Sequence, residues 1–309
     1  MKLLRENDGI FFAALSYVMW GIVPIYWKWI QDVPADEILA HRVFWSFVFM
    51  MLLLFATRKL SGFILYVKEM AKQPKKLAAL GAASILVSAN WGIFIWAVNS
   101  GRILETSLGY YINPLVSVLL GVIVLREKLN MPQVISFLLA AVGVLILTLH
   151  YGKVPWVSLL LAITFGLYGL AKKMIQADSA IGLTLETMMI TPLALGYFIY
   201  LTFQSETMFF DSARNGLLLA GGGAVTALPL LYFAKGAQKV PLSMLGFLQY
   251  IAPTLTLILG VFVYHETFTK VHLLAFIFIW SALTIYTISQ AMLKRPRISK
   301  VKEKTGFGA

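Results

Sequence analysis

One seventeen-residue pattern occurs twice in the chain, and it constrains the fold more than any other feature of the sequence. The first copy runs from Tyr111 to Glu127 and the second from Tyr250 to Glu266, at an offset of 139 residues. Eight of the seventeen aligned positions are identical, among them a tyrosine, a proline, a glycine and the closing glutamate. Apolar segments match easily by chance, but these residue types in a fixed register do not. The pattern predicts an internal duplication, which bears on the fold class before any single element does.

The composition places both copies in a membrane. The chain is 59% hydrophobic and 13% charged, with a mean hydropathy of +0.80, whereas soluble domains are about half apolar and about a quarter charged. The apolar residues form runs of about twenty, the length that crosses a hydrocarbon core of roughly 30 Å. There are no cysteines, which excludes disulfides, thiolate metal sites and a cysteine nucleophile. The net charge of +12 lies mostly in short connections, so we attribute it to membrane orientation rather than to nucleic-acid binding.

Breakers and charged residues divide the chain into ten predicted transmembrane helices. The first continues for about twenty residues without a small-residue cleavage pattern, so we interpret it as a retained helix rather than a signal peptide. Val33-Pro34, Met131-Pro132 and Lys239-Val-Pro241 are examples of the junctions. The predicted spans are 10–30, 37–57, 77–98, 103–125, 132–150, 154–174, 182–203, 215–235, 241–264 and 271–292.

The basic residues give this count an orientation. With the N-terminus in the cytoplasm, 20 of the 26 lysines and arginines fall on cytoplasmic segments and four on outer ones, while Lys28 and Arg42 fall within spans. This asymmetry follows the positive-inside rule and predicts that both termini are cytoplasmic. Residues 1–9 are then a cytoplasmic N-terminus and residues 293–309 a basic cytoplasmic tail. The segment 58–76 is long enough for a short interfacial helix.

The topology gives the duplication its meaning. Residues 10–150 and 154–292 each hold five helices, an odd number, so the second half enters the membrane from the opposite side. We therefore predict an all-α membrane protein built from two inverted five-helix repeats. This is the architecture of transporters that work by alternating access, with a binding site near the midplane between the repeats.

Three further stretches resemble a known family. They are Pro34-Ala-Asp-Glu-Ile-Leu-Ala-His-Arg42, Asn99-Ser-Gly-Arg-Ile-Leu-Glu-Thr-Ser-Leu-Gly-Tyr110 and Pro241-Leu-Ser-Met-Leu-Gly-Phe-Leu-Gln-Tyr-Ile-Ala-Pro253. With the doubled motif, they resemble the drug/metabolite transporter superfamily, specifically its EamA-type ten-helix members, and most closely the RarD group of chloramphenicol-sensitivity proteins. The resemblance covers about residues 8 to 292. It implies an inner-membrane permease and leaves the substrate open.

Arg42 is the first candidate for a transport residue, because ionisable groups within a membrane are costly and often functional. It lies with His41 about a turn and a half into the second span. Arg42 could bind a substrate carboxylate or form a gating ion pair. Equally, it could extend to the interface or pair with Asp36.

Four glutamates are candidates for coupling or gating. Glu105 and Glu186 could titrate during a transport cycle, although both lie near helix ends, where the helix dipole is a sufficient explanation for Glu186. Glu127 and Glu266 close the two motif copies at helix C-termini, where the dipole disfavours a carboxylate. We interpret these two as boundary residues that could form gate contacts or pair with basic loop residues.

Polar and aromatic residues at depth are the candidates for the substrate cavity. Asn113 and Gln249 lie just ahead of the motif prolines, which remove a backbone donor and tend to kink a helix. A freed carbonyl and a polar side chain beside it can then face a ligand. With Arg42, the predicted cavity set is Trp20, Asn90, Trp91, Tyr110, Tyr111, Asn113, Gln249 and Tyr250.

The sequence contains no motif for catalysis, metal binding or a cofactor. The run Gly221-Gly222-Gly223 lies within a span and lacks the lysine of a nucleotide-binding loop, so it suggests close helix packing. We therefore expect a secondary transporter, not an enzyme, that exports small amphipathic or aromatic metabolites or drug-like compounds. Its expected partners are a small-molecule substrate and the lipid bilayer. A membrane enzyme acting on a lipid-linked substrate and a passive channel are the alternatives, and the oligomeric state stays open.

Overall fold

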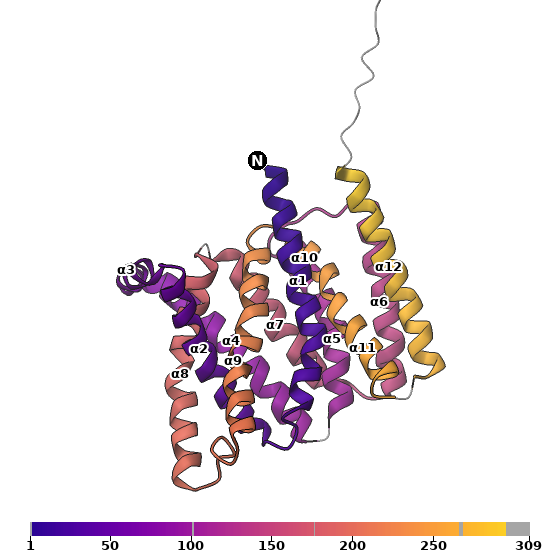
Figure 1. Ribbon diagram of the computed structural model, residues 1–309. Coiled ribbons are helices and arrows are strands. Elements are labelled where there is room, and N and C mark those ends of the chain that lie inside the picture. The colour runs from indigo at the N-terminus through magenta and orange to yellow at the C-terminus, as the bar shows by residue number, and fades with distance from the viewer. Residues whose placement is uncertain (1, 101, 176, 266–267, 295–309) are drawn as a thin grey trace, which may run out of the picture.

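The computed structural model describes residues 2–100, 102–175, 177–265 and 268–294. Every regular element in these ranges is an α-helix (Figure 1). The helices are α1 (Lys2–Lys28), α2 (Ala35–Ala56), α3 (Leu60–Ala71), α4 (Pro74–Asn99), α5 (Ile103–Ile123), α6 (Met131–Tyr151), α7 (Trp156–Met174), α8 (Ser179–Phe203), α9 (Ala213–Ala237), α10 (Leu242–Gln249), α11 (Ile251–Phe262) and α12 (Lys270–Lys294).

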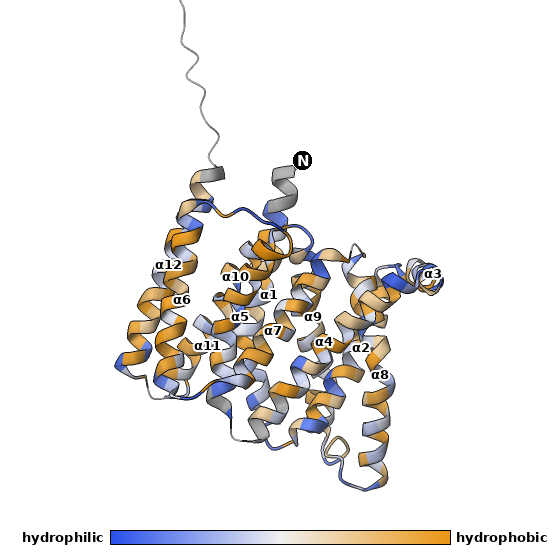
Figure 2. Cartoon of the chain, turned by 180° about the vertical axis from the view of Figure 1, so that it is seen from behind, coloured by the Kyte–Doolittle hydropathy of each residue, from blue (hydrophilic) through white to orange (hydrophobic). Residues whose placement is uncertain are grey.

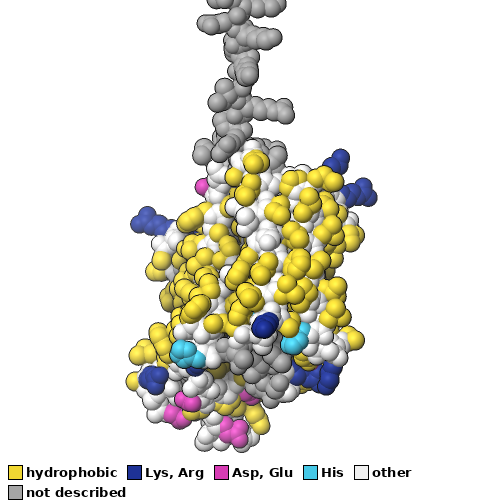
Figure 3. Space-filling model, turned by 90° about the vertical axis from the view of Figure 1, so that its right-hand side faces the viewer, with side chains coloured by type: hydrophobic (Ala, Val, Ile, Leu, Met, Phe, Trp, Pro, Cys, Tyr) yellow, Lys and Arg dark blue, Asp and Glu magenta, His cyan; other side chains and the backbone are white. Residues whose placement is uncertain are grey.

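The ten predicted spans are confirmed. Among the described residues, ten stretches are long and apolar enough to cross a membrane, and each coincides with a predicted span. Hydrophobic residues run along these helices, and hydrophilic ones gather at their ends (Figure 2). On the face shown in Figure 3, hydrophobic side chains cover the middle of the molecule and charged ones lie toward its two ends. The N-terminal end of α1 and the C-terminal end of α12 lie at the same end of the bundle (Figures 1 and 2).

The predicted junctions lie at helix starts: Pro34 precedes α2, Met131 begins α6 and Pro241 precedes α10. Other helix ends are capped by side chains or glycine. Asn130 caps α6 in a capping box with Gln133, and Gly152 ends this helix with a φ of 74°. The side chain of Asp178 caps α8, and that of Ser212 caps α9.

Pro253 divides the ninth span into α10 and α11. A proline has no N–H to donate to the carbonyl four residues earlier, here that of Gln249, and α10 ends at that residue. Its repeat counterpart, Pro114, lies within α5, which continues through it. The two copies of the motif therefore differ in backbone structure.

Small residues allow the backbones of several helices to approach closely. A Cβ on Gly223 of α9 would lie 2.3 Å from the backbone of Trp45 on α2, and one on Gly236 would lie 2.9 Å from Ala13 on α1. The predicted role of the glycine triplet in close helix packing is confirmed. The short helix predicted within residues 58–76 is also present as α3, which buries Phe63 and Met70 and exposes Ile64 and Leu65.

Candidate functional site

Arg42 lies where four helices meet. Its guanidinium carbon is 4.7 Å from the ring centre of Trp27 on α1 and 5.1 Å from that of Trp91 on α4. Its Nε donates to Thr226 Oγ1 on α9 at 3.2 Å. Such cation–π contacts contribute about 0.5–2 kcal/mol each, more where water is excluded. Tyr110 of α5 also interacts electrostatically with this guanidinium.

Arg42 has no carboxylate partner in the described part of the chain. Asp36, the expected alternative partner, accepts a hydrogen bond from Tyr197. Glu37 accepts from the hydroxyl of Thr207 and the backbone N–H of Met208, and lies 3.6 Å from His41. The terminal amino groups of Arg42 have no hydrogen-bond partner among the described residues, and these groups form the fork that binds carboxylates in two-point contacts.

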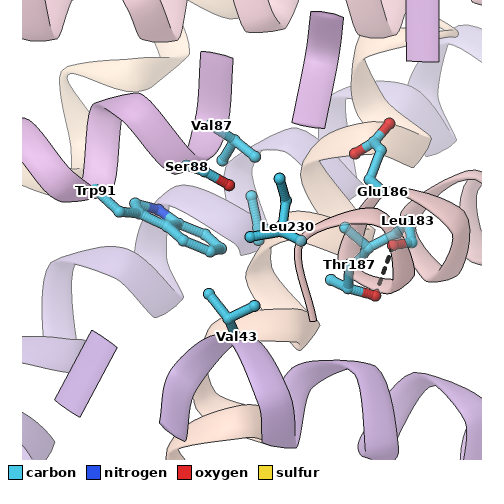
Figure 4. Close-up of a pocket in the computed structure, with 9 residues that line it drawn as sticks. Val43, Val87, Ser88, Trp91, Leu183, Glu186, Thr187 and Leu230 are labelled. Carbon is cyan, nitrogen blue, oxygen red and sulfur yellow. Dashed lines mark hydrogen bonds between the residues drawn. The ribbon is translucent and has the colours of Figure 1, made fainter. Parts of the chain in front are cut away.

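A narrow cavity lies beside Trp91 (Figure 4). It has room for about one water molecule, far less than a site that encloses a drug-sized ligand. In this conformation the cavity is closed to a ligand of that size. Four helices, α2, α4, α8 and α9, supply its lining residues, which are Val43, Val87, Ser88, Trp91, Leu183, Glu186, Thr187, Ile190 and Leu230.

Glu186 is the one charged residue among those that line this cavity. Its side chain is 1% exposed, and its Oε1 lies 2.7 Å from Lys172 Nζ on α7. Tyr168, one turn before Lys172, donates its hydroxyl to Oε2 at 3.2 Å. Lys172 is one of the basic residues that the sequence places on cytoplasmic segments, and no pattern in the sequence pairs it with Glu186. Tyr168 and Lys172 are four residues apart, which places both on one face of α7. This spacing is the sequence feature that indicates a shared partner.

Glu105 connects three helices at the opposite end of the bundle from the termini. Its carboxylate lies 3.2 Å from Arg102, accepts the hydroxyl of Tyr151 at 3.0 Å, and accepts the backbone N–H of Val157 at 3.2 Å. Glu105 thus caps the first turn of α7, whose own N-cap residue is Pro155. This arrangement explains its burial without a role in coupling.

Glu127 caps a helix other than its own. It follows the end of α5, and its carboxylate accepts the backbone N–H groups of Leu242 and Ser243 at 2.7 and 2.9 Å. A carboxylate at the N-terminus of α10 is favoured by the dipole of that helix. The expectation of an unfavourable dipole considered only the helix that Glu127 ends. Glu266 lies outside the described residues.

The candidates from the doubled motif lie where α5 crosses α10. A Cβ on Gly246 would be 2.6 Å from the carbonyl oxygen of Pro114. Ser117 donates to Gln249 Oε1 at 3.4 Å, and Tyr250 donates to the carbonyl of Tyr111 at 3.3 Å. Asn113 is buried beside them, and its Oδ1 has no hydrogen-bond partner among the described residues.

Asn90 and Trp20, two further predicted cavity residues, both contact α7. Asn90 precedes Trp91 on α4 and donates to the carbonyl of Leu161 and to Thr164 Oγ1, both at 2.9 Å, which joins α4 to α7. Trp20 packs against Phe165 and Phe233. Of the predicted set, the structure thus brings Trp91 and Tyr110 to Arg42, and a second group lies at the α5–α10 crossing.

Comparison with known proteins gives consistent matches along the whole chain. The EamA-like transporter family matches it twice, over residues 7–149 and 154–288. A crystal structure with a TM-score of 0.68 covers 95% of this chain and 100% of its own, at 16% identity, and so supports the fold alone.

Several bacterial proteins are similar to the chain over nearly their full length. It is 51% identical to the "Uncharacterized transporter YojE" of Bacillus subtilis (strain 168), over 96% of this chain and 98% of that protein. It is 40% identical to "Protein RarD" of Escherichia coli (strain K12), over 97% of this chain and 100% of that protein. The "Chloramphenicol-sensitive protein RarD" of Pseudomonas aeruginosa is 29% identical, over 94% of this chain and 97% of that protein.

Proposed function

The chain belongs to the EamA-like transporter family, and from this membership we propose that it is a secondary-active exporter of small metabolites or drug-like compounds. The observation that carries the proposal is Arg42, a cation between two indole rings with no carboxylate partner among the described residues. Ionisable residues within membrane-spanning helices are costly and often mark substrate pathways.

The surroundings of Arg42 favour a substrate that combines a carboxylate with an aromatic group. A guanidinium binds a carboxylate through two parallel hydrogen bonds, and Arg42 has its terminal amino groups available. Trp91, which lies over the guanidinium, also lines the cavity and would present a ring to an aromatic substrate. Aromatic amino acids and related acids have both features.

Alternating access between two inverted repeats is the mechanism we propose, and the helix pairing supports it. We number the ten membrane spans in chain order, so that the proposed repeat relates each span of the first half to the span five positions later. The contact of spans four and six (α5 with α7) then corresponds to the contact of spans nine and one (α11 with α1). Likewise α2 with α9 corresponds to α8 with α4, and α1 with α9 to α7 with α4. Three further contacts, α2–α8, α5–α10 and α6–α12, each join a span to its own repeat counterpart, so the repeat maps each of these pairs onto itself. Such a set of pairings is expected of a two-fold axis in the membrane plane.

The orientation we propose is that of the cytoplasmic membrane with both termini inside. The 20 to four division of basic residues supports it. The N-terminal end of α1 and the C-terminal end of α12 also lie on the same side of the bundle (Figure 1). Glu186 then lies toward the cytoplasm and Arg42 toward the outside.

Counterflow in proteoliposomes tests the function. The panel consists of radiolabelled phenylalanine and tryptophan, their decarboxylated amines, and chloramphenicol, because one relative's name refers to that drug. We expect saturable counterflow of the acids and little of the amines. Arg42→Gln should reduce it about tenfold to a hundredfold, since a charged hydrogen bond contributes about 1.5–3 kcal/mol. Arg42→Lys keeps the charge and loses the fork, so it should rescue only part of the flux.

Arg102 provides the matched control. It also lies between two tryptophans, Trp96 and Trp156, but it is already paired with Glu105. Arg102→Gln should keep counterflow within about twofold of the wild type. An equal loss in both variants would contradict the assignment of Arg42, and flux that never saturates would favour a passive channel. A folded protein that carries no member of the panel would show that the substrate class is wrong.

A further inference from the structure

The ion pair between Lys172 and Glu186 has no counterpart among the described residues. Of the lysine–carboxylate and arginine–carboxylate pairs there, it is the one whose two side chains are both almost fully buried, at 4% and 1% exposure. A buried pair often stabilises a protein no more than apolar side chains of similar volume would. Stability alone therefore does not explain why two charges lie inside this bundle, whereas a role in transport would.

The two partners differ in how easily each can stand alone. Lys172 lies in the last turn of α7, where the carbonyl end of the helix dipole favours a positive charge. Glu186 lies two turns into α8 and lines the cavity. If a proton breaks the pair, Lys172 keeps its interaction with the carbonyl end of α7, which offsets part of the cost of a lone buried cation. The carboxylate is thus the partner that is placed to change its charge.

Few other groups face this carboxylate. Tyr168 and Lys172 approach it from α7, and Ser84 of α4 donates to the backbone carbonyl of Glu186. Tyr66 on α3 has its pKa raised by burial and by the charge of Glu186. The α2 and α9 side chains that line the cavity are apolar. Ser88 of α4 and Thr187 of α8 are polar residues that also line the cavity. In the described part of the chain, the hydrogen-bond partners of the Glu186 carboxylate are thus Lys172 and Tyr168.

We propose that Glu186 is the proton-binding residue of the transport cycle, and that Lys172 and Tyr168 hold it deprotonated in the closed form. This inference rests on the proposed transport function and adds the coupling ion and its site. Trp91 lines one side of the cavity and also covers Arg42, while Glu186 lines another side. A charge change at Glu186 therefore occurs in the cavity that Trp91 also lines, and Trp91 covers the arginine proposed to bind the substrate.

The proposed step is a single proton transfer. A proton from water at the face to which the cavity opens binds a carboxylate oxygen of Glu186. Lys172 remains an ammonium, so the net charge of the pair rises from zero to +1. At the opposite face the proton returns to water, and the contact of Lys172 with Glu186 forms again. One proton moves across the membrane in each cycle.

Infrared spectroscopy tests the site without a substrate. The full-length protein in lipid nanodiscs is titrated from alkaline to mildly acidic buffer, and the carbonyl band of protonated carboxyl groups is recorded. We expect the wild type to gain a band that Glu186→Gln lacks. Lys172→Gln removes the cation, so the same band should persist to higher pH. A Glu186→Gln spectrum that matches the wild type would overturn the proposal, as would no displacement in Lys172→Gln.

Glu105 supplies a matched control, because it is also buried, at 3% exposure, and is hydrogen-bonded on both oxygens. Glu105→Gln should retain the band that Glu186→Gln loses. Loss of that band in both variants would mean that it reports the fold, which would overturn the assignment.

Transport tests the coupling, with phenylalanine as the probe. Under one-for-one exchange, a gradient of about one pH unit can drive about tenfold accumulation. Glu186→Gln should lose the accumulation to a much greater extent than it loses counterflow, which needs no gradient. Accumulation that persists in Glu186→Gln would overturn the inference while leaving the proposed function intact. Absence of phenylalanine counterflow in the wild type would count against the proposed function alone, and the infrared titration would still decide whether Glu186 binds a proton.

Discussion

Two arginines in this protein have similar aromatic surroundings and differ in their charge partner. Arg42 and Arg102 each lie over two tryptophan rings, but of the two only Arg102 has an ion-pair partner among the described residues. The pair at Arg102 includes a carboxylate that also caps α7, so it has a structural explanation. Arg42 has no such structural explanation, so the transport experiment compares substitutions at Arg42 with one at Arg102.

At the same scale, Gly223 is expected to tolerate no side chain. A Cβ there would lie 2.3 Å from the backbone of Trp45, which cannot move aside as a side-chain end could. Gly223→Ala should therefore lower the free energy of unfolding by about 1–3 kcal/mol or more. The thermal midpoint and the yield of monodisperse protein in detergent measure this.

Gly92→Ala is the control, because a Cβ at Gly92 would meet nothing within 4 Å. It should unfold at or slightly above the wild-type midpoint, since alanine favours a helix more than glycine does. Equal midpoints for the two variants would contradict the inference that α2 and α9 are in backbone contact.

At the scale of elements, the sequence predicts which segments are helices but not which helix each polar side chain caps or contacts. The ten spans follow from runs of apolar residues, and Pro253 marks the interruption between α10 and α11. By contrast, Glu127 caps α10 from 115 residues away. Such a contact depends on the packing of α5 against α10, and no local pattern encodes it.

The buried partner of Glu186 was missed for a related reason. Lys172 is near a helix end, so the charge count along the sequence includes it with the cytoplasmic residues. Its side chain nevertheless turns into the protein to reach α8. The sequence therefore predicted the group around Arg42 only in part, and it did not reveal the ion pair.

Asp178 connects α3 to the start of α8 and gives a pH-dependent prediction. Its carboxylate caps α8 through Ala180 and Ile181, and it lies 2.7 Å from Lys59. Burial raises the pKa of Asp178, but the contacts with Lys59 and the two N–H groups outweigh it, so the pKa is lowered. The stabilisation is present above the unfolded value, about 3.9, and is lost as the pH falls through the folded value.

Asp178→Asn isolates the charge, because asparagine caps a helix about as well as aspartate. At neutral pH the variant should be less stable by about 0.2–1 kcal/mol, the range for a partly exposed pair. In acid the two proteins should converge. Hydrogen exchange of α3 and of the first turn of α8 measures this, and a difference that is constant with pH would show that the ion pair contributes nothing.

At the scale of the whole molecule, the orientation can be tested because the chain has no cysteine. Ser61 on α3 and Ser205 after α8 are both exposed and lie at opposite ends of the bundle. In intact cells, a thiol reagent that does not cross membranes should label Ser205→Cys and spare Ser61→Cys until the membrane is opened. The reverse pattern would mean that both termini face outward, against the distribution of basic residues.

The contact between α2 and α9 also restricts how the molecule can move. Gly223 meets the backbone of Trp45, Ser46 donates to the carbonyl of Gly223 at 3.1 Å, and Arg42 donates to Thr226. In kinematic terms the two helices form a single rigid link, although one comes from each half of the sequence. Under the proposed alternating-access mechanism, displacements that open the cavity would then occur where α4 and α8 meet this link. The boundary between the moving bodies would therefore not follow the boundary between the two proposed repeats.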